Sequence, residues 1–293
     1  MASPLRWCRA SPFKGSPLGR GGRRALLAAG YAATTAFFAL PLLWTLSLSL
    51  RTLREAYAYP PLLIPSHPTA AGYATVWSTT PIVRYLHNSV AIVGFTVLAS
   101  LCVSVPAAYA LSRFRFRSRR AVLWSLLAVR MVSPVVIIVP LYRYYAALGL
   151  LDSLPALVAA YVAVQAPVAT WILKGFLDGI PADLDHAAMV DGCTRWQALL
   201  RVILPVAGPG IASAVILDAT FGWSQFLIPL VLLADSRHFP ISVGILAFQS
   251  SAESISIHLL AAASIIAVAP VLILFVALQR HIVAALTAGA VKG

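Results

Sequence analysis

The chain has 293 residues, of which 60% are hydrophobic and only 11% are charged. Soluble domains carry about 25% charged residues, so this composition excludes an ordinary soluble globule. The formal net charge of +13 would suit a nucleic-acid partner. The basic residues, however, lie in short clusters beside long apolar runs, a pattern typical of membrane topology signals. We therefore expect a polytopic all-α membrane protein in contact with the lipid bilayer and without a nucleic-acid partner.

The apolar runs set the expected order of spans, because a helix needs about 20 apolar residues to cross a bilayer. The segment 25–50, for example, contains no Asp, Glu, Lys or Arg. Before it, residues 1–24 predict a basic, disordered tail. Six transmembrane helices are expected, at about 25–50, 88–112, 121–141, 154–173, within 202–233, and 259–278. Together they predict one membrane domain, 25–283, and a short C-terminal tail, 284–293.

The distribution of Lys and Arg predicts the orientation of these spans. If both termini are cytoplasmic, the inside segments hold six in the N-terminal tail, five after the second span, three around the polar loop and two at the end. The outside segments then hold only five, and Arg130 lies within a span. Cytoplasmic segments carry the excess of positive charge. We therefore expect both termini, and the polar segment between spans 4 and 5, in the cytoplasm.

That polar segment, 180–211, interrupts an otherwise apolar sequence. Pro181 is suited to the first turn of a helix, and Asp185 complements the positive end of the helix dipole. Gly192 supplies the left-handed conformation that commonly ends a helix. A second, amphipathic helix is expected from about Thr194. The segment therefore predicts a cytoplasmic helix–Gly–helix corner at 180–205, which from the residues alone is either a docking surface or an ordinary connecting loop.

The sequence lacks the motif of an ATPase. A phosphate-binding P-loop requires Gly-Lys followed by Ser or Thr. Each of the three lysines, Lys14, Lys174 and Lys292, is instead followed by glycine. The HExxH, CxxC and GxSxG motifs are also missing from the sequence, which disfavours a membrane enzyme. We therefore expect no enzyme activity and no cofactor in this chain.

The polar loop closely resembles a known family element. HAAMVDG at 186–192, followed by Leu204-Pro205, resembles the EAA loop of ATP-binding-cassette importer permeases. In that loop, Glu-Ala-Ala and Asp-Gly precede an apolar stretch that ends in Leu-Pro. Further segments resemble the carbohydrate-transporting, maltose-permease-G-like branch: Asn88-Ser89, AYALSRFRF at 108–116, GLLD at 149–152 and LTAGAVKG at 286–293. The resemblance extends from about residue 25 to the end.

The resemblance implies a division of labour among several subunits. The permease would pair with a second, similar permease in the bacterial inner membrane, and an extracytoplasmic solute-binding protein would deliver a sugar or oligosaccharide. Two ATPase subunits would bind ATP and Mg, and the EAA loop would dock on one of them. The implied coupling residues are Asp185, His186, Ala187, Ala188, Asp191 and Gly192. His186 stands where the family usually has glutamate, which puts any contact of that carboxylate in question.

Two charged residues lie within expected spans, Arg130 in the third and Asp218 in the fifth. An unpaired charge at mid-membrane costs about 2.5–3.5 kcal/mol on insertion scales. They can hold the bundle together as an ion pair, or contribute to a substrate pathway with Trp223, Ser224 and Gln225. The last three lie in a segment that resembles the family's Trp-Asn-Glu/Asp-Phe, with Ser and Gln replacing the usual polar pair.

Two alternative functions remain open at this stage. One is a self-contained secondary transporter that uses Arg130 and Asp218 for ion coupling. The other is an importer permease of the same family for a non-sugar solute, such as a polyol or glycerol phosphate. Dependence of uptake on a separate ATPase distinguishes the first alternative, and the ligand of the binding protein distinguishes the second.

Overall fold

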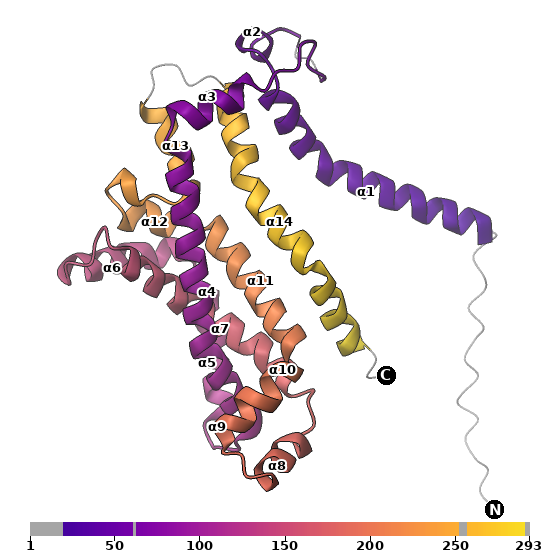
Figure 1. Ribbon diagram of the computed structural model, residues 1–293, viewed down its shortest axis with the longest axis vertical. Helices are drawn as coiled ribbons and strands as arrows, with labels where there is room; N and C mark the ends of the chain where they lie inside the picture. Colours follow the sequence, from indigo (N-terminus) through magenta and orange to yellow (C-terminus); the bar gives the residue numbers. More distant parts are fainter. Residues whose placement is uncertain (1–19, 61–62, 252–256, 291–293) are drawn as a thin grey trace, which may run out of the picture.

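The structure is a computed structural model that describes residues 20–60, 63–251 and 257–290. Every regular element in these ranges is a helix (Figure 1). The bounds are α1 Arg20–Ser49, α2 Leu53–Ala56, α3 Ala71–Thr79, α4 Ile82–Arg113, α5 Arg119–Met131, α6 Pro134–Ala147, α7 Leu154–Leu177, α8 Asp183–Val190, α9 Arg195–Ala198, α10 Leu204–Val206, α11 Gly208–Ser224, α12 Leu227–Leu232, α13 Ile241–Ser251 and α14 Ile257–Ala290, with a π-helical turn at Leu199–Ile203 and a 3-10 turn at Ser236–His238.

The two expected tails differ in part from the structure. Most of the tail expected at 1–24 lies outside the described residues, but α1 already begins at Arg20. At the other end, α14 continues to Ala290, so residues 284–290 of the expected tail are helical. The last three residues lie outside the described part.

Four helices in the described residues are long and apolar enough to cross a membrane: Arg24–Ser49, Ile82–Arg113, Leu154–Leu177 and Ile257–Ala277. Two helix pairs reach this length only together, Arg119–Met131 with Pro134–Ala147 and Arg195–Val206 with Gly208–Ser224. These pairs are bent by 94° and 81°. The described chain thus has six candidate spans if each bent pair counts as one, which is consistent with the expected polytopic fold.

The expectation of a continuous third span at 121–141 is wrong. α5 ends at Met131 and α6 starts at Pro134, with Ser133 in an extended conformation between them. The proline ring disfavours a helical conformation for the residue before it, and its own missing N–H breaks the helical hydrogen-bond ladder. The span is therefore broken near its middle, and Arg130 lies at the end of a helix beside that break.

α4 and α7 form the centre of the bundle, where they pack along one another. One buried cluster joins them to the π-helical turn and α11, and includes Ala108, Leu173, Leu199, Ile203 and Ala214. There are two more buried clusters, one among α4, α6, α7 and α12 and one among α3, α4, α13 and α14. These clusters position the two ends of α4 against other parts of the chain.

The bundle has two distinct ends along the length of α4 (Figure 1). α2 and α3 lie at one end, and α8 and α9 lie at the other. α1 contacts α14 and then extends away from the bundle, with large apolar side chains exposed along it. The end with α8 is called the α8 end below, and the opposite end is called the α3 end.

Candidate functional site

The polar loop at the α8 end forms the expected helix–Gly–helix corner. α8 starts at Asp183, so Pro181 precedes the helix instead of lying in its first turn. The turn after α8 has the hydrogen bonds of a Schellman motif, from Cys193 N to Ala188 O at 3.0 Å and from Gly192 N to Met189 O at 3.1 Å. Gly192 has a φ of +85°, which side-chain-bearing residues rarely adopt. The corner therefore depends on this glycine.

The second arm of the corner starts at Thr194, as expected. Its hydroxyl accepts a hydrogen bond from Gln197 N at 3.3 Å, and Gln197 Oε1 accepts one from Thr194 N at 2.8 Å. This reciprocal capping box satisfies two backbone donors at the helix start. The π-helical turn that follows buries Leu199 and Ile203, whereas Trp196 is 56% exposed. The arm therefore packs one face into the bundle and leaves an aromatic ring on the other.

Asp185 ties α8 to the ends of two long helices. Its Oδ1 accepts a hydrogen bond from Tyr109 Oη at 2.7 Å, and its Oδ2 lies 2.7 Å from Arg113 Nε. The Arg113 guanidinium also donates to the carbonyl oxygens of Leu177 at 3.1 Å and Ile180 at 3.0 Å. The Arg113 and Asp185 side chains are only 10% and 7% exposed. This set of contacts, the Arg113–Asp185 clamp, fixes α8 against α4 and α7.

Two further contacts bind the end of α4 to the loop. The Arg195 guanidinium lies over the Phe114 ring, 5.2 Å from its centroid. On the other side, Ser112 Oγ donates a hydrogen bond to Asp178 Oδ1 at 2.8 Å, and Lys174 forms an ion pair with the same carboxylate. Sequence reasoning treated the basic run after the second span only as a topology signal, and it did not identify Tyr109 or Arg113 as functional candidates.

The six residues implied for coupling separate into two faces of the corner. Asp185 and Ala188 point into the bundle, and Ala188 is only 5% exposed. Ala188 therefore packs against the bundle, although the resemblance implied a coupling role for it together with Ala187. His186, Ala187, Asp191 and Gly192 are exposed, and Val190 beside them is 87% exposed. This exposed side of α8 is called the outer α8 face.

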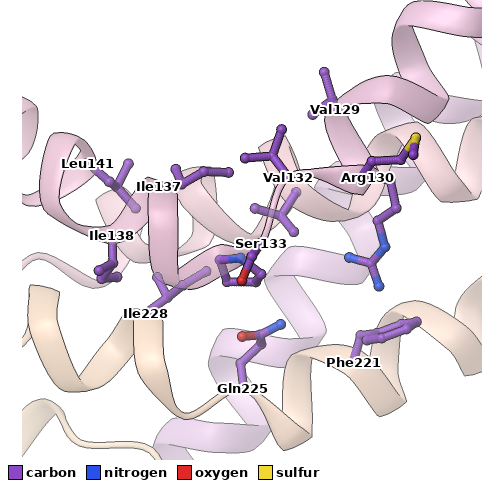
Figure 2. A pocket seen from close by; sticks show the side chains of 13 residues that line it. Val129, Arg130, Val132, Ser133, Ile137, Ile138, Leu141, Phe221, Gln225 and Ile228 are labelled. Atoms are coloured by element: carbon purple, nitrogen blue, oxygen red, sulfur yellow. The ribbon is translucent and has the colours of Figure 1, made fainter.

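A cavity of about 370 Å³ lies at the break between α5 and α6 (Figure 2). Its wall is mostly apolar and is completed by α7, α11 and α12, from which Val164, Phe221, Gln225 and Ile228 contribute. Arg130 extends from α5 toward α11, and its guanidinium lies over the Phe221 ring at 4.5 Å from the centroid. Gln225 points from the other side toward Ser133. The cavity thus contains two of the five residues considered for the substrate pathway.

The other three of these residues lie elsewhere. Asp218 is 3% exposed and lies against Ser100 of α4, and the described residues contain no ion pair between it and Arg130. Trp223 Nε1 donates a hydrogen bond to Ala267 O at 3.0 Å, which joins α11 to α14. Ser224 is exposed and its hydroxyl bonds the Phe221 carbonyl at 3.2 Å. Arg130 and Asp218, which the sequence left open as an ion pair, therefore do not pair in this structure.

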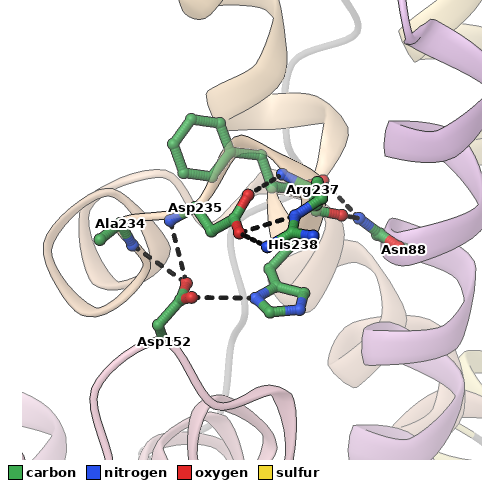
Figure 3. Close-up of polar contacts among 7 residues, drawn as sticks. Asn88, Asp152, Ala234, Asp235, Arg237 and His238 are labelled. Atoms are coloured by element: carbon green, nitrogen blue, oxygen red, sulfur yellow. Dashed lines mark hydrogen bonds and ion pairs between the residues drawn. The ribbon is translucent and has the colours of Figure 1, made fainter.

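At the α3 end, Asp152 holds the loop between α12 and α13 (Figure 3). Its Oδ1 accepts hydrogen bonds from Ala234 N and Asp235 N, both at 3.1 Å, and its Oδ2 lies 3.2 Å from His238 Nδ1. Burial raises the pKa of Asp152, but the hydrogen bonds from Asp235, His238 and Ala234 outweigh it and lower the pKa below its usual value. Hydrogen bonds from Arg237 lower the pKa of Asp235 to about 2.

The start of α4 holds the same loop from the other side. Asn88 Nδ2 donates to the carbonyl oxygens of Arg237 at 2.8 Å and Phe239 at 3.0 Å (Figure 3). Ser89 Oγ accepts a hydrogen bond from Ile241 N at 2.7 Å. α4 is therefore one continuous helix whose two ends are bonded to the two loops at opposite ends of the bundle. In the sequence, Asn88-Ser89 stood out only through the family resemblance, which predicted no contact for either residue.

The described helices form a multi-pass membrane fold, with one broken span beside a mid-bundle cavity and a polar corner bonded to the bundle at one end, an arrangement consistent with a transporter. The chain belongs to the family of binding-protein-dependent transport system inner membrane components, whose model matches residues 100–288. The resemblance of the polar loop to importer permeases is thereby confirmed. The chain is thus a membrane component of a binding-protein-dependent transport system.

Similar proteins extend over nearly the whole chain. The sulfoquinovosyl glycerol transport system permease SmoH of Agrobacterium fabrum is 35% identical over 96% of this chain and 95% of its own length. The trehalose transport system permease SugB of Mycobacterium tuberculosis is 34% identical over 91% and 95%. A chain of a solved bacterial ABC transporter that imports the acidic polysaccharide alginate has a TM-score of 0.76 at 21% identity, covering 91% of this chain and 100% of that one. This last likeness supports the fold.

Proposed function

We propose that this chain is a permease subunit of an ATP-driven importer that carries a sugar or oligosaccharide across the bacterial inner membrane. Family membership supports the transport function, and relatives named for sulfoquinovosyl glycerol and trehalose support a carbohydrate substrate. The proposed coupling mechanism rests on the difference between the two sides of α8. One side of this helix is clamped into the bundle through Asp185, and the other side is exposed.

The outer α8 face is the proposed docking surface for an ATPase subunit. Ala187 and Val190 present small side chains and permit a close approach, while Trp196 on the next arm adds an exposed aromatic ring. Trp is enriched among the residues that contribute most to binding at protein interfaces. ATP and Mg would bind to two partner ATPase subunits, since this sequence has no P-loop.

The proposed orientation places the α8 end and both termini in the cytoplasm. The excess of Lys and Arg on segments assigned to that side supports it, including the basic run Arg113 to Arg120 next to the clamp. The α3 end then faces the extracytoplasmic space, where a solute-binding protein would deliver the carbohydrate. A second permease of similar fold would complete the pathway.

α4 provides a physical connection between the two loops. Its 32 residues span ~48 Å at ~1.5 Å per residue. A movement of α8 imposed by the ATPase would act on Arg113 through Asp185. The same helix carries Asn88 and Ser89, which hold the extracytoplasmic loop. We propose that α4 moves as one body with α8 and so transmits ATPase closure to the opposite side of the membrane.

The test is a reconstitution of the purified chain with its partner permease, ATPase and binding protein in proteoliposomes. Uptake of a carbohydrate bound by the binding protein should require the ATPase and Mg-ATP on the α8 side. Uptake driven by an ion gradient without the ATPase would support the secondary-transporter alternative. ATP-dependent uptake confined to a polyol or glycerol phosphate would retain the importer and reject the sugar assignment.

A further inference from the structure

The cavity at the break between α5 and α6 lies near the middle of the bundle. Val164, which lines it, is close to the midpoint of the 24-residue helix α7. Phe221 lies 13 residues beyond the start of α11, ~20 Å along that helix. The cavity has a volume of about 370 Å³, which is within the range of small-molecule sites, about 300 to 1,000 Å³. A solute crossing the membrane beside these helices would pass this position.

Among the described residues that line the cavity, Arg130 alone is charged. Within the described residues it forms no ion pair, and its guanidinium makes a cation–π contact with the Phe221 ring. Charged side chains within membrane spans usually pair with other charges or mark substrate pathways, because leaving them unpaired is costly. The cavity therefore carries a positive charge that no carboxylate in its wall neutralises.

The geometry of the guanidinium suits an anionic ligand. The planar guanidinium carries its N–H donors in a fork that can bind two oxygens of a carboxylate or a similar anion. The Phe221 ring, whose centroid lies 4.5 Å from the guanidinium carbon, holds the cation at the cavity wall. The low-dielectric apolar wall strengthens such an interaction relative to water.

Two polar side chains complete the cavity. Ser133 precedes α6, and its hydroxyl makes no capping hydrogen bond to that helix. The Gln225 amide points toward it from the junction of α11 and α12 (Figure 2). A hydroxyl and an amide each donate and accept hydrogen bonds, which suits the hydroxyl groups of a sugar. The positive end of the α6 dipole adds to the field of Arg130.

We infer that this cavity binds an anionic group, a carboxylate or a sulfonate, on the carried saccharide, with Arg130 as its counter-ion and Ser133 and Gln225 on its hydroxyls. This inference rests on the proposed function and narrows its substrate class to acidic saccharides. Arg130 is then a specificity-determining residue of the permease, in addition to the selection made by the binding protein.

The test uses the complete importer in proteoliposomes with two pairs of probes. One pair is a disaccharide ending in glucuronate and the same disaccharide ending in glucose, and the other is 6-deoxy-6-sulfoglucose with glucose. The intact chain should take up the acidic member of at least one pair in preference to the neutral one, and the pair that responds identifies the anion. Arg130→Gln should reduce this preference about 10-fold or more, the scale of a lost charge-assisted hydrogen bond.

Three variants separate recognition from folding. Arg130→Lys keeps the charge and should retain part of the preference, whereas Phe221→Leu should weaken it by freeing the guanidinium. Arg143→Gln, in the exposed part of α6 outside the cavity wall, is the matched control and should change nothing. ATP-dependent uptake of only the neutral sugars, unaltered by Arg130→Gln, would overturn the inference and leave the proposed function intact. Uptake of no saccharide by an ATP-hydrolysing importer would overturn both.

Discussion

Arg113 Nε lies 2.7 Å from Asp185 Oδ2, although the two residues are 72 positions apart. The pair joins the end of a membrane-spanning helix to the short helix that carries the outer α8 face. Because Arg113 also binds the Leu177 and Ile180 carbonyl oxygens, the end of α7 belongs to the same unit. A force applied to α8 therefore reaches two spans directly.

Replacing Asp185 with Asn should loosen α8. Removing one partner of a buried ion pair costs about 3–5 kcal/mol, and we expect the lower end because the Tyr109 hydrogen bond can persist. Hydrogen exchange of residues 183–203 should accelerate, and uptake per ATP hydrolysed should fall. Asp183→Asn, on the exposed side of the same helix, is the control and should change stability by less than about 0.5 kcal/mol. Equal effects of the two variants would argue against the clamp.

Replacing Gly192 with Val should distort the corner. At a φ of +85° a residue with a side chain costs about 1–2 kcal/mol, and a β-branched residue is the least suited. Gly192→Asn should be milder, since Asn adopts the left-handed region more readily. The readout is the affinity of the purified permease for its ATPase partner. Identical affinities for the Val and Asn variants would mean that the turn conformation does not control docking.

Arginine at Ala187 and at Ala188 should give different defects. At the exposed Ala187 it should leave folding intact and weaken ATPase binding by blocking close approach. At Ala188, which is 5% exposed, it should force a long charged side chain into the packed interior and destabilise the corner itself. Thermal unfolding of the detergent-purified protein, measured beside ATPase binding, distinguishes the two. Lost stability in the Ala187 variant would contradict the assignment of the outer face.

The loop held by Asp152 should loosen in acid. A carboxylate whose pKa is lower in the folded state stabilises that state above its unfolded pKa, about 3.9, and the contribution is lost as pH falls through the folded pKa. Protection of the 234–239 amides from hydrogen exchange should thus decline as the pH falls below about 4. Asp152→Asn should lower protection at neutral pH and flatten this decline. An unchanged profile in that variant would exclude Asp152 as the acid-sensitive group.

Local signals account for what the sequence predicted well. Gly192 and the Thr194–Gln197 capping box act within a few residues, so their turn and helix start could be read directly. The long charge-free run before Arg113 likewise predicted α4, although the helix begins at Ile82, earlier than expected. Such features depend on backbone preferences and on the number of apolar residues a bilayer requires.

Features that depend on tertiary packing were not predicted. The break at Ser133-Pro134 was missed because the expected third span is, apart from Arg130, a long and mostly apolar run, although the Ser-Pro step was the available signal. Ala188 is buried because its side of α8 packs on the bundle. The sequence of α8 does not indicate which side that is, since small residues occur on both sides of the helix. The Arg113–Asp185 contact joins distant segments, so nothing in the local sequence of either residue identifies it.

The most direct test of ATPase coupling through α8 is a comparison of uptake by the reconstituted importer with the intact chain and with Ala187→Arg. The intact importer should take up saccharide only with the ATPase and Mg-ATP present, and the folded variant should lose most of that uptake without loss of substrate binding by the binding protein. Full ATP-driven uptake with Ala187→Arg, or uptake from an ion gradient by the permeases alone, would contradict the account.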